Sequence, residues 1–302
     1  GGSRHPGVSG PVDPGSPKPL APRGLGWMLA ASAAFAVMVV SVRAASRSLP
    51  WAEVAAFRAA VGTLVAGAAV RLHRVPFGLW ASGPAWGRSG FGALAMAGMF
   101  YAFSQPDLPL GDVATLRATA PFVVAGLGWL FLKETPGRRV ALGLPVAFVG
   151  VAVMLQPRFE AGWDLALWVL AATSASAVAT LFLRRLRDHP PDAVAFQFGV
   201  VATVVLGSLA VPDLAWPDGP GLGFGVLAGV AGGVGQLCLT RAYRWDHAGK
   251  VAAVSFSSVI LVQVFGAIVL REWPGREQLF GSGLVIAAGL ILVWPRSKTA
   301  PA

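Results

Sequence analysis

Two arginines lie inside long apolar segments of the sequence, where a charged side chain needs a specific reason to be present. Arg58 falls within the apolar segment 52–70, and Arg117 falls within the segment 111–132. A guanidinium is costly in hydrocarbon, so each is expected to face a cavity or a partner. A guanidinium also binds a carboxylate through two parallel N–H···O bonds. Both arginines are therefore candidates for binding an anionic group of a small solute.

The competing interpretation is that these arginines are structural and bond to backbone carbonyls or snorkel toward the interface. Each has an acid five residues earlier, Glu53 and Asp112. Five residues is about 140° around a helix, so neither acid shares the face of its arginine. At 1.5 Å per residue, both arginines lie about 9 Å below the predicted outer interface. We interpret Arg117 as solute-binding and leave Arg58 between the two roles.

The elements that must position these arginines are ten apolar segments. Hydrophobic residues make up 55% of the chain and charged residues 13%, whereas a soluble domain carries about 25% charged residues. Each segment is near the length of about twenty residues that crosses the hydrocarbon core. The sequence therefore predicts an all-α membrane protein with ten transmembrane helices. They are expected at 24–42, 52–70, 87–105, 111–132, 139–156, 163–183, 191–211, 220–240, 250–270 and 277–295.

The basic residues are distributed unevenly between the two sides of the predicted membrane. With the N-terminus in the cytoplasm, seventeen Lys and Arg side chains fall on the cytoplasmic side and five on the outer side. This bias predicts that both termini are cytoplasmic in a bacterial-type inner (plasma) membrane. The net charge of +10 then belongs to short connectors facing the lipid bilayer, so no nucleic-acid partner is expected.

An internal repeat divides the chain. Phe131-Leu-Lys-Glu-Thr-Pro-Gly-Arg138 matches Val269-Leu-Arg-Glu-Trp-Pro-Gly-Arg276 at an offset of 138 residues. Five helices per repeat invert the second copy, which predicts two inverted five-helix repeats, the architecture of alternating-access carriers. The predicted units are a disordered cytoplasmic tail at 1–23, a first repeat at 24–157, a second repeat at 158–295 and a cytoplasmic C-terminal tail at 296–302.

Further candidates for the solute site follow from the repeat. Arg58 aligns with Gln197, and Arg117 aligns with Ser255, so the second half offers neutral polar groups where the first offers cations. Tyr101 is an aromatic candidate at membrane depth. For each of these the competing interpretation is an ordinary helix contact. Two prolines, Pro121 and Pro145, are predicted to kink the fourth and fifth helices and to free backbone groups that could line the cavity.

A stripe of small residues occurs in the segment 220–240. Gly221, Gly225, Gly229 and Gly233 recur every four residues, which permits close approach of a neighbouring helix. The pattern leaves open whether that neighbour lies in the same chain or in a second copy. Intramolecular packing is the commoner case, so a monomer is favoured over a dimer.

The chain resembles the EamA family of the drug/metabolite transporter superfamily. The match rests on Glu53…Arg58, on Tyr101-Ala-Phe…Leu108-Pro-Leu-Gly-Asp112…Pro121…Leu130-Phe-Leu-Lys-Glu134, and on the repeated pattern ending at Glu272 and Gly281. The resemblance implies export of amino acids, other metabolites or drugs, and one branch exports aromatic amino acids. It also gives Arg58 a common architectural role, which favours the structural interpretation there. Phe35-Ala36 replaces the family's frequent Trp-Gly, which adds Phe35 to the solute-binding candidates.

No cluster of chemistry-bearing residues supports an enzyme. The single Cys238 and the four histidines suggest no metal site, and no catalytic residue, metal or cofactor is expected. No Asp, Glu or His lies deep in a predicted helix, which favours facilitated diffusion over proton antiport. The predicted function is export of small metabolites, with aromatic or apolar amino acids preferred. The alternative is export of drugs or other amphipathic solutes. A membrane-embedded enzyme or a channel is less favoured.

The predicted orientation is testable by labelling. In a Cys238→Ala background, a cysteine replacing Glu160 should react with a membrane-impermeant maleimide added to intact cells. A cysteine replacing Asp188 should react only after the cells are opened. The reverse pattern would contradict the topology.

Overall fold

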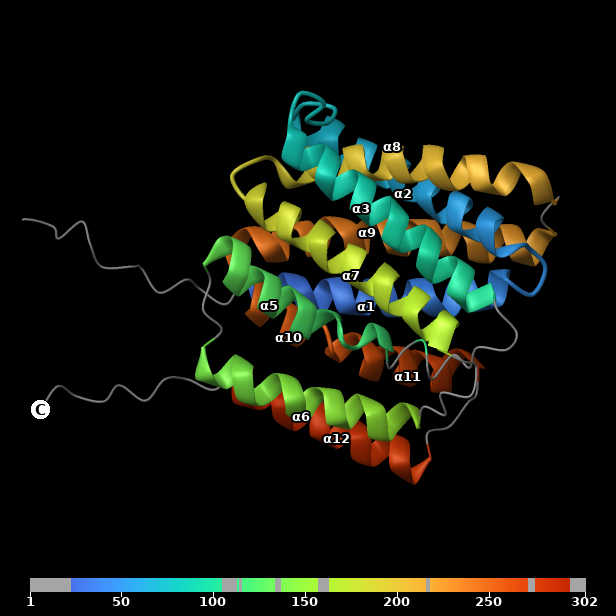
Figure 1. Ribbon diagram of the computed structural model, residues 1–302. Helices are drawn as coiled ribbons and strands as arrows, with labels where there is room; N and C mark the ends of the chain where they lie inside the picture. Colours follow the sequence, from blue (N-terminus) through green and yellow to red (C-terminus); the bar gives the residue numbers. More distant parts are fainter. Residues whose placement is uncertain are drawn as a thin grey trace, which may run out of the picture.

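The computed structural model describes residues 23–104, 113, 116–133, 137–156, 163–215, 218–270 and 275–293. Every regular element within these residues is helical (Figure 1), as the sequence predicts. The helices are α1 (Arg23–Ala45), α2 (Trp51–His73), α3 (Gly83–Ser104), α5 (Ala120–Leu132), α6 (Arg138–Leu155), α7 (Trp163–Arg185), α8 (Pro191–Ala210), the 3-10 helix η1 (Val211–Asp213), α9 (Gly219–Trp245), α10 (Ala248–Val254), α11 (Ser257–Leu270) and α12 (Arg276–Val293).

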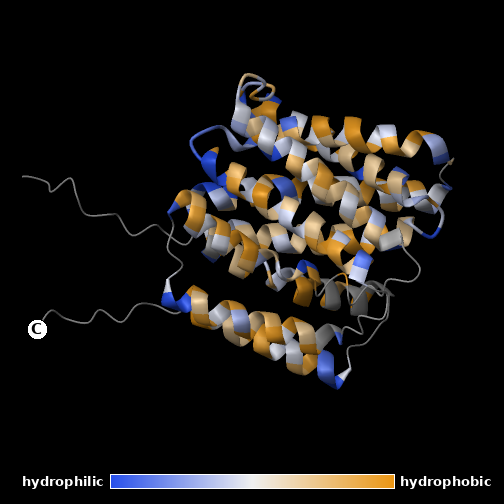
Figure 2. Ribbon diagram, viewed as in Figure 1, coloured by the Kyte–Doolittle hydropathy of each residue, from blue (hydrophilic) through white to orange (hydrophobic). Residues whose placement is uncertain are grey.

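The surface of the helix bundle suits a lipid environment. Five helices, namely α1, α2, α7, α8 with η1, and α9, are long and apolar enough to cross a membrane by length and composition. Figure 2 shows apolar residues along the helices and hydrophilic residues gathered near their ends. Large apolar side chains such as Leu64, Val204 and Leu142 remain mostly exposed. In water such a surface would be a liability, whereas in a bilayer it contacts acyl chains.

The helices pack as two related halves. The equivalent helices of the two halves are α1 and α7, α2 and α8, α3 and α9, and α5 and α11. If each helix is replaced by its equivalent, the α1–α9 contact becomes the α7–α3 contact. In the same way, the α2–α9 contact becomes α8–α3, and the α1–α11 contact becomes α7–α5. Two further pairs, α2 with α8 and α6 with α12, join equivalent helices of the two halves. The packing therefore has the two-fold pattern that a duplicated five-helix unit predicts.

The α2–α8 pair shows that the second half is inverted. At one end, Glu53 at the start of α2 accepts a hydrogen bond from the backbone N of Ala215, just beyond η1, at 3.0 Å. Near the middle, the hydroxyls of Thr63 and Thr203 lie 3.1 Å apart. The equivalent helices therefore run antiparallel, as required when one half is turned over in the membrane.

The other end of this pair is joined by the repeat equivalent of Glu53. Asp192, at the start of α8, lies 2.8 Å from the ring Nδ1 of His73 at the end of α2. Two buried acids at equivalent positions thus connect the halves at opposite ends of the α2–α8 pair.

Two helices are interrupted at equivalent places. A turn at 118–119 precedes α5, and a turn at 255–256 separates α10 from α11. Pro121 stands in the first turn of α5, where its ring and missing N–H prevent a helix from running in from residue 117. Pro145 lies within α6, which continues through it.

The second interruption contains no proline and was not predicted from the sequence, which placed one continuous helix over 250–270. The hydroxyls of Ser255, Ser257 and Ser258 donate to the carbonyls of Ala252, Val254 and Ser255 at 2.6–2.8 Å. Side chains that bond to nearby carbonyls compete with the helical ladder, which accounts for a break at this serine cluster.

The glycine stripe of α9 packs within the chain. A Cβ built on Gly233 would lie 2.9 Å from Cβ of Val65 in α2 and 3.0 Å from Cα of Gly62. A Cβ on Gly229 would overlap Val61, and one on Gly225 would lie 3.1 Å from Phe57. The open question about the stripe's neighbour is therefore answered: it is α2.

The α6–α12 pair lies side by side at one edge of the bundle (Figure 1). It also relies on small residues, because a Cβ on Gly150 would lie 2.8 Å from the carbonyl oxygen of Gly281. At the repeat offset of 138, Gly281 corresponds to Gly143 and Gly150 corresponds to Ala288. Gly143 and Ala288 are both buried, as expected if the two ends of this helix pair are equivalent.

The α2–α9 contact can be tested with a matched pair of substitutions on α9. Gly229→Ala should destabilise the fold, because its new methyl group meets the β-branched Val61, whose Cβ cannot move away from the backbone. Gly223→Ala faces open space and should gain the helix propensity of alanine, about 1 kcal/mol. We expect Gly229→Ala to be the less stable variant by about 1–3 kcal/mol, measured by thermal unfolding in detergent. Equal melting temperatures would contradict the close contact.

Candidate functional site

Arg58 projects from α2 into the interior of the bundle and is only 9% exposed. Its Nε donates to the sulfur of Met38 at 3.1 Å, and its terminal nitrogen donates to the sulfur of Met96 at 2.6 Å. A Cβ on Gly232 of α9 would lie 2.8 Å from that Nε, so the glycine makes room for the guanidinium. Thioether sulfurs are weak acceptors, and these contacts therefore leave the charge of Arg58 largely uncompensated.

Arg117 lies immediately before the interruption at 118–119. Its side chain is exposed, yet enough protein surrounds it that desolvation acts on the guanidinium. Exposure and desolvation are both accounted for if Arg117 lines an opening that is surrounded by protein, rather than a face of the bundle turned to lipid. Its charge also acts directly on Arg58, which places the two predicted arginines in one region.

A third arginine, Arg88, belongs to the same region. It lies in the second turn of α3, is 5% exposed, and holds its guanidinium over the ring of Phe198 at 4.2 Å. Its Nε has no hydrogen-bond partner among the described residues. Gly92, one turn further along α3, leaves the space that its terminal nitrogen occupies. The charge of Arg58 acts on Arg88, as that of Arg117 acts on Arg58.

The sequence did not identify Arg88. Arg88 is one of the seventeen Lys and Arg side chains that the sequence assigns to the cytoplasmic side. The predicted helix begins at residue 87, whereas α3 begins at Gly83. One signal in the sequence could have identified Arg88. The segment Trp86-Gly-Arg88-Ser89 leads directly into the long apolar run 90–100, so the helix could have been extended toward the N-terminus to place Arg88 inside it. A helix start four residues earlier moves Arg88 from the interface into the membrane.

A narrow pocket lies between α2, α8 and α9. Arg58, Gly62, Phe198, Gly232 and Gln236 are among its lining residues, and it has room for about one water molecule. Gln236 is 8% exposed, and its side-chain nitrogen finds no acceptor in the part of the chain that the structure describes. The bundle is thus closed to a solute at this level.

A wider recess of about 540 Å³ opens at the end of the bundle where α2 ends and α8 begins. Three arginines, two aspartates and aromatic side chains line it. Its lining includes Arg23, Trp27, His73, Asp188, Asp192, Arg241, Arg244 and Trp245.

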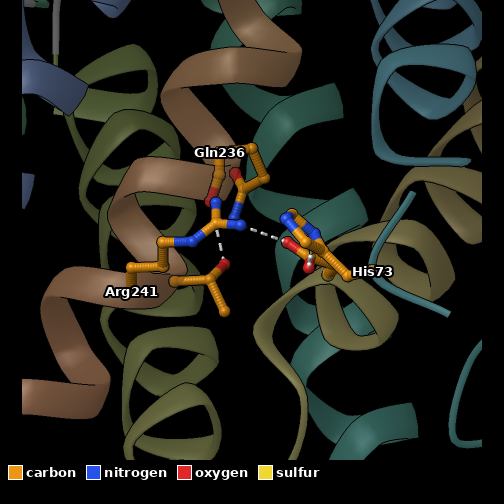
Figure 3. A network of polar contacts seen from close by, with 5 residues as sticks. His73, Gln236 and Arg241 are labelled. Carbon is orange, nitrogen blue, oxygen red and sulfur yellow. Dashed lines mark hydrogen bonds and ion pairs between the residues drawn. The ribbon is translucent and has the colours of Figure 1, made fainter. Parts of the chain in front are cut away.

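Asp192 organises this recess. Its carboxylate, 6% exposed, accepts from Arg241 at 2.6 Å and lies 2.8 Å from His73. Figure 3 shows the contacts that lead from Arg241 across to His73, with Gln236 beside Arg241. Arg241 also stacks over the ring of Trp27 at 5.3 Å. The network joins the ends of α2, α8 and α9, so it must loosen if these helices separate at this end.

The neutral repeat partners have local roles. Gln197 is fully buried and accepts a hydrogen bond from the backbone N of Leu79 at 2.7 Å, which holds the connector between α2 and α3. Ser255 is partly buried at the interruption, where its hydroxyl donates to the carbonyl of Ala252 at 2.6 Å. These contacts do not bring either residue to the three arginines.

The aromatic candidates lie on different surfaces. Tyr101 sits between the rings of Trp51 and Trp168, with centroid distances of 5.8 and 5.6 Å. Phe35 packs on α9, where a Cβ on Gly235 would lie 2.8 Å from its ring. Both remain solute-binding predictions. Among the described residues, no three His, Cys, Asp or Glu side chains gather as a metal site would need.

Duplicated inverted helices, interrupted helices and internal cations without a described carboxylate partner define a polytopic membrane transport protein. The model of the EamA-like transporter family matches residues 22–156 and again residues 164–294. The chain belongs to the EamA-like transporter family, and it is a transporter of small solutes, not an enzyme.

Relatives are transporters of diverse solutes. The chain is 30% identical to the pseudopaline exporter CntI of Pseudomonas aeruginosa over 272 residues, which covers 87% of this chain and 93% of the exporter. It is 23% identical to an S-adenosylmethionine uptake transporter of Rickettsia felis, over 63% of this chain and 65% of that protein. One crystal structure matches with a TM-score of 0.78 at 14% identity, over 89% of this chain and 96% of that chain. The last likeness concerns the fold alone.

The Asp192 network can be tested by removing its charge. Asp192→Asn should lower the free energy of unfolding, because it leaves Arg241 facing a neutral amide in a partly buried site. Removing one partner of a fully buried ion pair costs about 3–5 kcal/mol; Arg241 is 20% exposed, so we expect about 1–3. Asp188→Asn, at a carboxylate that is 84% exposed, is the control and should change the melting temperature little. Comparable effects of the two variants would contradict the organising role of Asp192.

Proposed function

We propose that the chain is an alternating-access exporter of small carboxylate-bearing metabolites, with amino acids, aromatic or apolar ones first, as the leading class. The observation that carries the proposal is Arg117, an accessible guanidinium at a helix interruption with a second cation, Arg58, beside it. An accessible cation enclosed by protein attracts the anionic end of a solute.

The two interruptions support this location. Ala118, at the first interruption, packs in one cluster with Ala253 and Phe256, at the second. Discontinuous helices that meet between inverted repeats are where carriers commonly bind their solutes, because unwound backbone there can contact them. Tyr101, with Trp51 and Trp168, would then offer aromatic surface to the apolar part of the solute.

The ends of the α2–α8 pair support alternating access. Asp192 with His73 and Arg241 joins helices at one end, and Glu53 with the Ala215 backbone joins them at the other. In the proposed cycle these contacts break in turn as one half rocks against the other. We place the recess around Asp192 at the cytoplasmic end of an inner membrane, on the bias of Lys and Arg in the connectors. Both termini then lie on that side, and the chain acts as a monomer.

The alternative, export of cationic drugs, is less favoured on electrostatic grounds. Three arginines act on one another in the interior, and no described carboxylate pairs with any of them. A cationic solute that approached these arginines would be repelled by them. The acids Glu53, Asp192 and Asp246 lie at helix ends and are already bonded, which favours facilitated diffusion over proton coupling.

The role of Arg117 can be tested by transport into proteoliposomes. Arg117→Gln should keep the fold but weaken uptake of carboxylate-bearing solutes, because a charged hydrogen bond worth about 1.5–3 kcal/mol is lost. We expect the affinity to fall about ten- to a hundredfold. Arg117→Lys should restore only part of it, since the bidentate grip is lost.

The control for this measurement is Arg47→Gln. Arg47 is an exposed arginine at the turn after α1, and its replacement should leave uptake unchanged. Unchanged uptake and KM in Arg117→Gln would instead show that Arg117 is structural.

A further inference from the structure

The described interior of the bundle has a surplus of hydrogen-bond donors. The buried side-chain atoms without a partner there are Nε of Arg88, the hydroxyl of Ser89, and the amide nitrogens of Gln197 and Gln236. No unsatisfied side-chain oxygen of a carboxylate or amide accompanies them. Leaving such donors unpaired costs about 1–3 kcal/mol each, so the interior is arranged for acceptors that the described residues do not supply.

The cations follow the same pattern. Arg117, Arg58 and Arg88 form a series in which each guanidinium acts electrostatically on the next. The described ion pairs involve other residues, all at helix ends or connectors. In the part of the chain that the structure describes, the guanidinium of Arg58 contacts the sulfurs of Met38 and Met96, and that of Arg88 lies over the face of Phe198.

The three arginines are too widely spread for one carboxylate to bind them all. Arg117 stands at the interruption before α5, whereas Arg88 stands in the second turn of α3 and reaches the region of Tyr243 in α9. A solute with a single carboxylate could meet only part of it. An amino acid of net charge zero would also bring its ammonium group close to a guanidinium.

We propose that Arg88 is a second anion-binding residue and that the solute carries at least two carboxylates, one for Arg117 and Arg58 and one for Arg88. This inference rests on the proposed function in its class of carboxylate-bearing solutes, and it replaces aromatic or apolar amino acids with dicarboxylates as the leading solutes. Arg88 is more than nine-tenths buried, stacks on Phe198 and occupies the space that Gly92 leaves open. Its Nε, which has no partner among the described residues, is the group that the second carboxylate satisfies. Gln236, at the pocket beside Arg58, offers a further neutral donor.

The test compares solutes that differ by one charge. Purified protein in detergent is titrated with glutarate and with its monoamide, glutaramate, and binding is followed by thermal shift. Leucine and phenylalanine serve as monocarboxylate amino acids. Wild-type protein should bind glutarate at least tenfold more tightly than glutaramate, as expected for one additional charged hydrogen bond.

Three variants identify the residue responsible. Arg88→Gln should reduce the glutarate preference to less than about threefold while leaving glutaramate affinity unchanged, since only the second contact is lost. Arg88→Lys should retain an intermediate preference, because charge remains without the planar fork. Arg71→Gln, at an exposed arginine near the end of α2, should behave as wild type.

The outcomes separate this inference from the proposed function. If wild-type protein binds leucine, phenylalanine or glutaramate as tightly as glutarate, the two-carboxylate inference is wrong and the carboxylate exporter stands. If none of these solutes binds, the proposed function itself fails. If Arg88→Gln keeps the full preference, Arg88 is a structural residue. Should that variant not fold, the wild-type ratio and Arg88→Lys still decide between these cases.

Discussion

The burial of guanidinium groups that have no carboxylate partner among the described residues is the constraint on which the rest of this structure depends. Arg58 and Arg88 are enclosed by sulfur atoms, an aromatic face and glycines, none of which neutralises a positive charge. A desolvated cation–π contact returns on the order of 2 kcal/mol, and a thioether sulfur is only a weak acceptor. Both are well below the cost of removing a cation from water. The remaining packing must therefore be tight enough to hold a charged interior together.

That packing comes from small residues at helix crossings. The glycines of α9 let α2 approach closely enough for Arg58 to reach the interior through the space above Gly232. Close backbone approach is a main source of helix association where lipid offers no hydrophobic gain. The α2–α8 pair adds hydrogen bonds at its middle and at both ends. The close helix crossings therefore both hold the bundle together and make room for the buried arginines.

The sequence predicted the spans, the repeat and two of the three arginines, because hydropathy, periodicity and an internal match are properties of the chain itself. It missed the interruption at 255–256, since a hydropathy run does not register hydroxyls that bond to carbonyls one turn back. It missed Arg88 because a four-residue change in a helix start moves a side chain about 6 Å in depth. The buried bond of Gln197 to Leu79 depends on a connector whose path no local pattern encodes.

The two halves share a fold but not a charge. Arg58 of the first half corresponds to Gln197 of the second at an offset of 139 residues. At an offset of 138 residues, Arg117 corresponds to Ser255 and Arg88 to Val226. In the alternating-access cycle proposed above, equal cations in both halves would hold an anion across the seam and resist its opening. With the cations on one half, a bound anion would stay with that half while the other half moves past it. The charge asymmetry within a symmetric fold therefore favours the proposed rocking cycle for an anionic solute.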